Sequence, residues 1–273
     1  MAAGRNSRRS RRNRGRFSFL FKLLAIVAVV AAMTVGATVF FQLEQVEVQG
    51  NSRYTVQEVE NASGLQKGDN LYRLNKHQIS NDILQKLPYV EELSIVRRLP
   101  STIVITVKEW MAMASIQPTE IPVGDAQEQD AEAAAPAQPA KDAWLISVGG
   151  KLLEPTYEGS TAIEVSGLTA LSPRAGTPLA VPQVQQDKLN SLLNLLSVLE
   201  ERGITNKVSE IDLTSAGEIR MRYDGRFLAK LPMNGDFTYC LRALEEVVAQ
   251  RESYEKGTLD LTRDDYTVVY SPE

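Results

Sequence analysis

Residues 89–109 read YVEELSIVRRLPSTIVITVKE, and this stretch decides the first folded unit of the chain. Over 102–109 large aliphatic residues recur at every second position, which is the period of a β-strand. A second strand is predicted over 90–98, and the Leu99-Pro100-Ser101 segment between the two predicts a turn. The stretch therefore predicts two strands that lie side by side.

The residues before this stretch predict a third strand and two short helices. Apolar and polar side chains alternate over 46–49, and the alternation stops at Gly50-Asn51. A capping box at 55–58 predicts the start of one helix, and Asn75 is the expected N-cap of the next. The order strand, helix, helix, strand, strand predicts an α+β unit over 44–110, a three-stranded sheet with both helices on one face.

The segment Leu23–Leu43 predicts a membrane-spanning helix. It contains no charged residue, and at about 1.5 Å per residue it is long enough for a hydrocarbon core of about 30 Å. Residues 1–22 carry eight positive charges and no acid, so we expect this basic tail in the cytoplasm and the remainder, with a formal charge of −12, outside. A signal peptide cleaved near Val35-Gly36-Ala37 is the alternative, although its apolar core is typically only about 7–15 residues long. Nucleic acid binding and a twin-arginine signal are further readings of the arginine tract, which membrane topology already explains.

Residues 111–271 predict a second, mixed α/β unit with an open sheet, which we call the β domain. The segment 117–143 is rich in Ala, Pro, Gln and acidic residues, and we expect a disordered insertion there. Helices are predicted over 185–202, where a leucine cluster favours core packing over a zipper, and over 236–250. Strands are predicted over 144–148, 151–153, 208–214, 218–223, 226–231, 258–262 and 266–271.

The sequence offers little for catalysis. Glycine-rich phosphate-binding motifs are absent, and the serines lack the usual motifs of an activated hydroxyl. Cys240 is the only cysteine and falls in a helical apolar pattern, which predicts a buried residue, and His77 is the only histidine and is expected to be solvated or to cap a helix. Neighbouring acids such as Glu91-Glu92 and Asp264-Asp265 alternate faces on a strand and do not form a carboxylate pair. We therefore expect no enzyme activity, cofactor, metal or nucleic acid partner.

An interaction surface is the better expectation. The unpaired N–H and C=O groups at the edge of an open sheet can add a strand from a partner protein. The last predicted strand contains Tyr266, Thr267, Val268, Val269 and Tyr270, whose alternating side chains suit this role.

Several motifs match a known family. The segments VEVQGN at 46–51, GLQKGDNLYRLN at 64–75 and LPYVEELSIVRRLPSTIVITVKE at 87–109 resemble the POTRA domain of the bacterial division proteins FtsQ and DivIB. In the second half, 144–154 and 258–262 resemble two further segments of that family. Trp110 and Met111 depart from the family pattern, which has Arg and Pro there.

The resemblance implies a function as well as a fold. It implies a non-catalytic, single-pass scaffold of the divisome, in the inner membrane at the septum, that recruits FtsB or DivIC and FtsL and links them to septal peptidoglycan synthesis. It also places the family's binding surface on the last strand, 266–270. Two alternatives stay open: a POTRA-type docking module in secretion or membrane insertion, and an extracytoplasmic enzyme that processes the cell wall.

Overall fold

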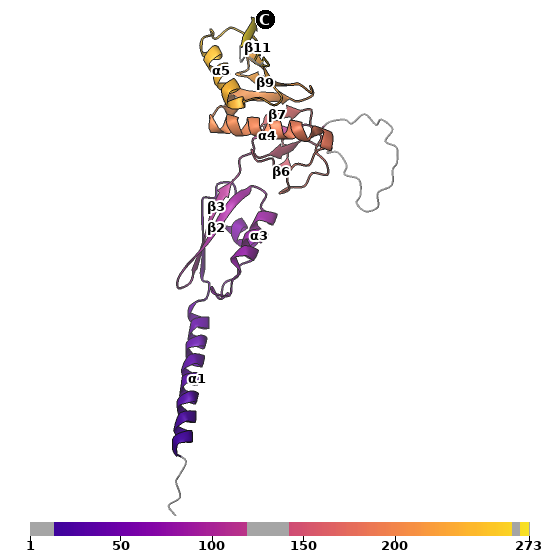
Figure 1. The fold of residues 1–273 in the computed structure, drawn as a ribbon. Coiled ribbons are helices and arrows are strands. Elements are labelled where there is room, and N and C mark those ends of the chain that lie inside the picture. Colours follow the sequence, from indigo (N-terminus) through magenta and orange to yellow (C-terminus); the bar gives the residue numbers. More distant parts are fainter. Residues whose placement is uncertain (1–13, 119–141, 264–267, 273) are drawn as a thin grey trace, which may run out of the picture.

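The computed structural model describes residues 14–118, 142–263 and 268–272. A long helix is followed by a first unit, which ends at residue 110, and then by the β domain (Figure 1). The predicted α+β class and the order of these parts are confirmed.

Helix α1 (Arg14–Phe40) is long and apolar enough to cross a membrane. Its most apolar window, Phe19–Gly36, has a mean hydropathy of 2.4 and no buried residue. The helix ends at Phe40, whereas the sequence predicts an apolar span as far as Leu43. Leu43 is only 1% exposed and belongs to the core of the first unit, so its apolar character serves folding of that unit rather than the span. Residues 1–13 of the predicted basic tail lie outside the described residues.

The first unit has the predicted element order. Its sheet runs β1-β3-β2, with β1 parallel to β3 and β2 antiparallel to it. The element bounds are β1 (Gln45–Gln49), α2 (Val56–Ser63), α3 (Lys76–Lys86), β2 (Val90–Arg98) and β3 (Thr102–Glu109).

Local sequence explains where these helices begin and end. Thr55 and Glu58 form both hydrogen bonds of the predicted capping box, and Gly64 closes α2 in the left-handed conformation. The Asn75 side chain accepts from the His77 and Gln78 backbone N–H groups and so caps α3. The helix starts predicted from the sequence are therefore correct.

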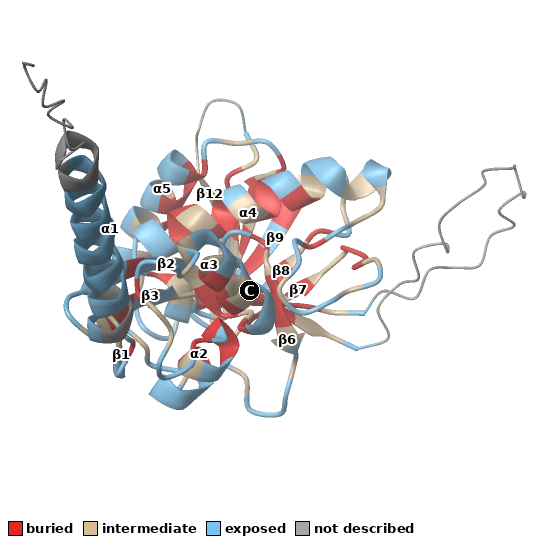
Figure 2. Cartoon of the chain, turned by 90° about the horizontal axis from the view of Figure 1, so that it is seen from below, coloured by how far each residue is buried: buried red, intermediate tan, exposed pale blue. Residues whose placement is uncertain are grey.

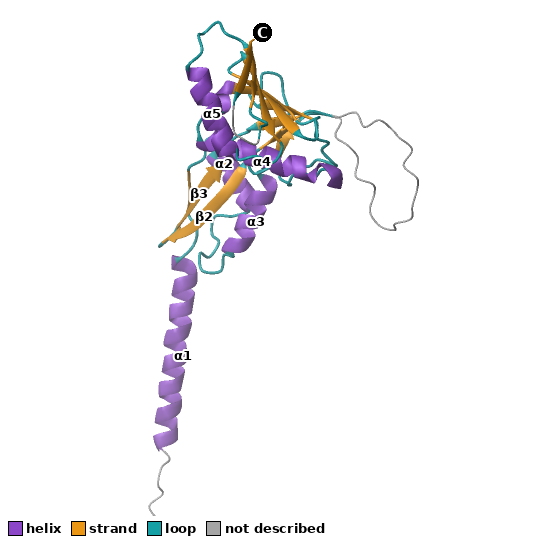
Figure 3. Ribbon diagram, turned by 45° about the horizontal axis from the view of Figure 1, so that its top comes forward, coloured by secondary structure: helices purple, strands orange, loops and turns teal. Residues whose placement is uncertain are grey.

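Both helices cover one face of the three-stranded sheet (Figure 3). Val59 of α2 and Ile83 of α3 are fully buried, and they pack in one cluster with Ile103 and Ile105 of β3. The turn after β1 depends on Gly50, because a Cβ there would overlap the Val107 carbonyl oxygen and the residue has a φ of 79°.

The β domain contains a nine-stranded mixed sheet, ordered β12-β11-β10-β9-β8-β7-β4-β5-β6. The pairs β4 with β7, β7 with β8 and β10 with β11 are parallel, and the others are antiparallel. The strands are β4 (Ala114–Ile116), β5 (Trp144–Ile146), β6 (Leu152–Pro155), β7 (Ile163–Ser166), β8 (Val208–Asp212), β9 (Glu218–Tyr223), β10 (Phe227–Pro232), β11 (Gly257–Asp260) and β12 (Val269–Pro272).

Helices α4 (Gln186–Glu201) and α5 (Phe237–Ala249) supply the other layer of the core. Figure 2 shows the buried residues gathered between helices and strands. Four of the clustered leucines of α4 are buried in this core and Leu193 is partly buried against it, which confirms core packing. Short 3-10 helices, η1 (Gln183–Gln185) and η2 (Thr205–Lys207), flank α4.

Strand β7 was not predicted from the sequence, although it holds the sheet together. It lies between β4 and β8 and is parallel to both. Its four residues, Ile-Glu-Val-Ser, show only two apolar positions, which is too short a pattern for a sequence prediction. The fold depends on it because it joins the early strands of the β domain to the later ones.

The two ends of the predicted insertion 117–143 lie on neighbouring strands. Strand β4 ends at Ile116, β5 begins at Trp144, and the two are paired antiparallel. This agrees with an insertion in the first hairpin of the β domain. Residues 119–141, on which the prediction of disorder falls, lie outside the described residues.

The two units meet through a small apolar cluster bordered by polar contacts. Tyr89 of the first unit is buried with Leu145 and Leu153 of the β domain, and Trp110 packs against them. Glu154 accepts a hydrogen bond from the Tyr89 hydroxyl at 2.7 Å and pairs with Arg53 at 2.7 Å. Trp110, which departs from the family pattern, is thus part of the contact between the units.

Candidate protein-binding edge

Strand β12 forms one outer edge of the nine-stranded sheet. It pairs antiparallel with β11, and Val269 lies opposite Asp260 while Tyr270 lies opposite Leu259. Within the described residues no strand pairs with its other side. Tyr266 and Thr267 of the predicted binding strand lie outside the described residues. The structure places the other three predicted residues, Val268, Val269 and Tyr270, at this edge.

The hydrogen bonds of β11 determine which backbone groups of β12 face outward. Gly257 donates its N–H group to the carbonyl oxygen of Arg226, directly before β10, and Leu261 donates to that of Lys230 in β10. Since backbone groups alternate sides along a strand, Thr258 and Asp260 turn toward β12. Their partners across the pair, Ser271 and Val269, therefore face inward, and Val268 and Tyr270 present their N–H and C=O groups at the open edge.

Tyr270 is anchored by its side chain. Its ring lies 6.5 Å from the Phe227 ring in an edge-to-face arrangement, and the Arg251 guanidinium sits 4.2 Å from its centre. The hydroxyl donates a hydrogen bond of 3.1 Å to the Lys256 carbonyl oxygen. The side chain thus holds the outward backbone groups of Tyr270 in a defined position.

The two valines lie on different faces of the sheet edge. Val268 is half-buried and packs against the main core, as does Tyr270. Val269 lies on the opposite face with Asp260 and is half-buried. Val268 therefore contributes to folding as well as to the edge.

Glycine at position 257 allows β12 to approach β11 closely. A Cβ on Gly257 would overlap the Ser271 carbonyl oxygen and would lie 2.9 Å from Cε2 of Tyr270. Sequence reasoning missed this residue, as it missed Phe227, Arg251 and Lys256. Of these four residues, only Gly257 carries a signal in the sequence, because a glycine next to a strand pattern can indicate that another backbone segment approaches closely.

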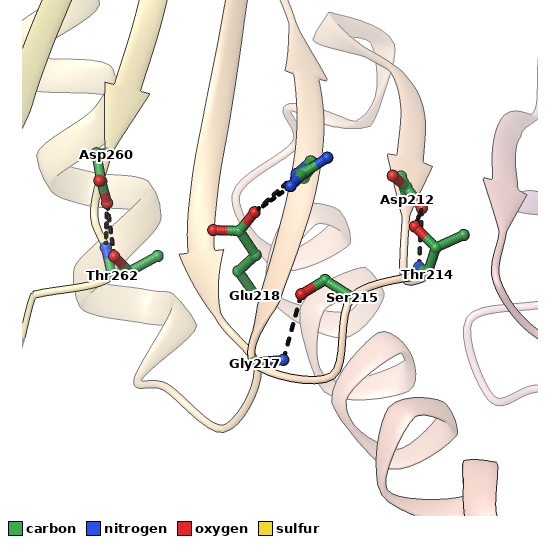
Figure 4. A network of polar contacts seen from close by, with 8 residues as sticks. Asp212, Thr214, Ser215, Gly217, Glu218, Asp260 and Thr262 are labelled. Atoms are coloured by element: carbon green, nitrogen blue, oxygen red, sulfur yellow. Dashed lines mark hydrogen bonds and ion pairs between the residues drawn. The ribbon is translucent and has the colours of Figure 1, made fainter.

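Two strands of the sheet, β11 next to this edge and β8 further inside, end in the same polar turn (Figure 4). Asp260 accepts hydrogen bonds from the Thr262 hydroxyl at 2.7 Å and the Thr262 N–H at 2.9 Å. Asp212 and Thr214, at the end of β8, form the same arrangement. The hydrogen bonds from the hydroxyl and the N–H group of Thr262 hold the pKa of the Asp260 carboxyl below its usual value. The Asp260 carboxylate is therefore ionised at neutral pH.

The described residues contain no group of three or more His, Cys, Asp or Glu side chains that could hold a metal ion. Cys240 is buried in α5, and burial raises the pKa of its thiol. His77 is exposed in the first turn of α3. Both lone residues lie where the sequence predicts them.

Comparison with known proteins identifies the first unit. Residues 41–110 match the model of the POTRA domain, FtsQ-type. This part of the chain is an FtsQ-type POTRA domain. The match begins two residues before Leu43, which agrees with the place of Leu43 in the core of that domain.

The similarity extends beyond the POTRA domain. The cell division protein DivIB of Clostridium acetobutylicum is 22% identical over 225 residues, which cover 82% of this chain and 80% of that protein. DivIB of Clostridium tetani is 23% identical over 79% of this chain and 75% of that protein. FtsQ of Corynebacterium glutamicum is 32% identical over 95 residues, 32% of this chain and 42% of that protein. The predicted resemblance to the FtsQ/DivIB family is confirmed.

Proposed function

We propose that this protein is a non-enzymatic scaffold of the bacterial division machinery, anchored by α1 with its POTRA and β domains outside the cytoplasmic membrane. Similarity to DivIB over most of the chain is the observation that carries the division role. The basic residues before α1 and the acidic balance after it support a cytoplasmic N-terminus. In this proposal the chain is enriched at the septum, where it assists peptidoglycan synthesis through its partners.

The proposed partners are FtsB or DivIC and FtsL, captured through the 266–270 segment and β12. The open edge of β12 supports this, because its outward backbone groups can accept a partner strand and Tyr270 holds them in place. Each added backbone hydrogen bond contributes a net free energy of about 1 kcal/mol. An edge of this length gives modest affinity by itself, and confinement of the partners to the same membrane raises their effective concentration.

Two substitutions at one position separate the backbone from the side chain. Tyr270→Ala removes the ring contacts and keeps the outward N–H group, whereas Tyr270→Pro removes both. We expect the proline variant to lose more partner than the alanine variant when the full chain is co-purified from native membranes. The measurement is the amount of FtsB or DivIC and FtsL bound per chain.

Lys230→Ala is the matched control, because Lys230 lies within the sheet on β10 and not at its edge. Circular dichroism of all variants checks that loss of partner does not follow loss of fold. Equal recovery with Tyr270→Ala and Tyr270→Pro would refute the role of the outward backbone. Hydrolysis of cell-wall material by the purified chain, abolished by changing one carboxylate, would refute the non-enzymatic role.

A further inference from the structure

Aromatic residues continue from the end of α1 into a loop of the POTRA domain. The Phe40 and Phe41 rings lie 5.2 Å apart, and the Phe41 and Tyr72 rings lie 5.0 Å apart, both edge to face. Phe40 is 66% exposed and Tyr72 is 56% exposed. Three aromatic side chains therefore form a continuous row from the apolar helix to the folded domain.

Backbone hydrogen bonds fix this loop to the end of the helix. Leu71 donates its N–H to the Phe41 carbonyl oxygen at 2.9 Å, and Leu43 donates to Asp69 at 2.7 Å. Gly68 donates in turn to Leu43 at 2.8 Å. The loop therefore cannot move away from α1 without breaking these bonds, and its height above the helix end is set by the fold.

The β2–β3 hairpin brings a second loop to the same end of the POTRA domain. Strands β1 and β3 are parallel, so both begin at this end, and Glu44 donates its N–H to the Ser101 carbonyl oxygen at 2.8 Å. Leu99, at the tip of the hairpin, is 52% exposed. Two exposed large side chains, Tyr72 and Leu99, thus belong to loops that hydrogen bonds hold beside the residues directly after α1. The tip of the β2–β3 hairpin points toward α1 (Figure 1).

Basic side chains accompany these apolar ones. Lys67 and Arg73 lie in loop 66–73, both are exposed, and neither forms an ion pair with another described residue. The acid within the loop, Asp69, accepts a hydrogen bond from the Gln66 N–H, so its carboxylate is directed at the backbone of its own loop. The combination of an exposed aromatic residue and basic residues is typical of protein segments in the headgroup region of a membrane.

We propose that loops 66–73 and 99–101 form a collar that rests in the outer headgroup region, with Tyr72 and Leu99 inserted and Lys67 and Arg73 near lipid phosphates. The inference rests on the proposed function, because it requires α1 to span the membrane with the POTRA domain outside. The surface that these loops contact is the lipid bilayer itself, since the aromatic row is continuous with the apolar helix. The collar would hold the POTRA domain upright and so set the height at which the β domain meets its partners.

Tryptophan fluorescence in membranes tests the collar. The full chain with Tyr72→Trp is reconstituted in vesicles of anionic and zwitterionic lipids whose acyl chains are brominated near the headgroup. Bromine quenches tryptophan only at short range, so we expect loss of the emission that the new tryptophan adds. The unchanged chain gives the baseline, because both of its tryptophans lie away from the collar. Trp110 follows the far end of β3, about 25 Å from the collar at the rise of a strand, and Trp144 begins β5 in the β domain.

Tyr254→Trp is the matched control, since Tyr254 is 79% exposed in the β domain. Its added emission should not be quenched. Lys67→Gln with Arg73→Gln, in the Tyr72→Trp chain, should reduce the quenching in anionic vesicles toward its value in zwitterionic ones. Quenching that these two substitutions leave unchanged would refute the part of the basic residues.

The outcomes separate the collar from the proposed function. Alkaline extraction and protease protection of the same vesicles report whether α1 is inserted with the POTRA domain on one side. An inserted chain whose Tyr72→Trp emission is not quenched overturns the collar and leaves the scaffold role intact. A chain that alkali extracts overturns the proposed topology and the collar together.

Discussion

At the scale of single residues, the binding edge depends on a glycine, because position 257 has no room for a side chain. Gly257 lets β12 lie against β11, because any Cβ would overlap the Ser271 carbonyl oxygen. The nearest atom in the way, the Ser271 carbonyl oxygen, belongs to the backbone, which cannot turn aside as a flexible side chain can. Small-to-large changes at such sites typically cost about 1–3 kcal/mol of folding free energy.

We predict that Gly257→Ala detaches β12 from β11. The free energy of unfolding should fall by about 1–3 kcal/mol, because strand β12 must shift to admit the methyl group. Hydrogen exchange at 269–272, together with denaturant unfolding, measures both effects. Gly217→Ala is the control, since nothing lies within 4 Å of a Cβ there. Unchanged protection of 269–272 in the Gly257→Ala chain would contradict the prediction.

A second residue, Glu109, ties the end of β3 to the loop before α2. Its carboxylate accepts hydrogen bonds from Ser52, at N and Oγ, and from the backbone N–H groups of Arg53 and Tyr54. Burial acts to raise the pKa of Glu109, but these hydrogen bonds together lower it below its usual value of 4.5. Because the folded pKa is the lower one, the stabilisation is fully present above about pH 4.5 and is lost as the pH falls through the folded pKa.

We predict that Glu109→Gln makes the chain less stable at pH 7 and flattens its loss of stability in acid. The neutral amide accepts hydrogen bonds more weakly than a carboxylate, so a loss of about 1–3 kcal/mol in unfolding free energy at pH 7 is expected. Denaturant unfolding between pH 3 and pH 7, chosen to bracket the usual pKa of 4.5, gives the measurement. Glu92→Gln, an exposed acid on β2, should change little. A pH profile parallel to that of the unchanged chain would rule out this role of Glu109.

At the scale of elements, strand β12 has two sides with different tasks. Val269 and Ser271 turn their backbone groups toward β11, and Val268 and Tyr270 turn theirs outward. The inward side stabilises the sheet, while the outward side is available for a partner. Substitutions that remove an inward backbone group should therefore reduce folding stability first. Those that remove an outward backbone group should reduce partner binding first.

We predict that Ser271→Pro weakens the pairing of β12 with β11. Proline removes the inward N–H group of residue 271, so one bond of the ladder is lost. Faster hydrogen exchange at 257–260 should report the loss, with a decrease of about 1 kcal/mol in unfolding free energy. Ser271→Ala keeps the N–H group and is the control. If Ser271→Pro left exchange unchanged, the assignment of inward and outward groups would be reversed.

At the scale of the whole molecule, the contact between the POTRA and β domains decides whether they act as one body. Glu154 bridges them, since it accepts from the Tyr89 hydroxyl and pairs with Arg53. Arg53 also lies 3.9 Å from the centre of the Tyr89 ring, and the Lys151 ammonium donates to the Val90 carbonyl oxygen at 3.0 Å. Burial and the hydrogen bond to Glu154 raise the pKa of Tyr89, so its hydroxyl remains a donor at neutral pH.

We predict that Glu154→Gln loosens this contact while each domain stays folded. An ion pair with this exposure contributes about 1 kcal/mol or less, so faster hydrogen exchange should be confined to the segments that meet, 89–90 and 151–154. Glu210→Gln breaks an exposed pair with Arg222 inside the β domain and is the control. Exchange that rises equally in β12 would show that the change acts on the whole β domain instead.

The sequence by itself determined the local elements of this protein. Caps, turns and apolar periods involve residues a few positions apart, so the starts of α2 and α3, the β2–β3 hairpin and the buried leucines of α4 could be predicted. The last strand was also predicted, as a candidate binding segment. Leu43 was assigned to the span because its neighbours in the sequence are apolar, although its contacts lie in the POTRA core.

Only the tertiary structure decided how these elements meet. The place of β7 between β4 and β8, the anchoring of Tyr270 by Phe227 and Arg251, and the bridge at Glu154 all join residues that are far apart in the chain. Which backbone groups of β12 face outward depends on how β11 bonds to β10. The physical reason is that strand order and side-chain packing are set by contacts across the fold, which no local period of the sequence records.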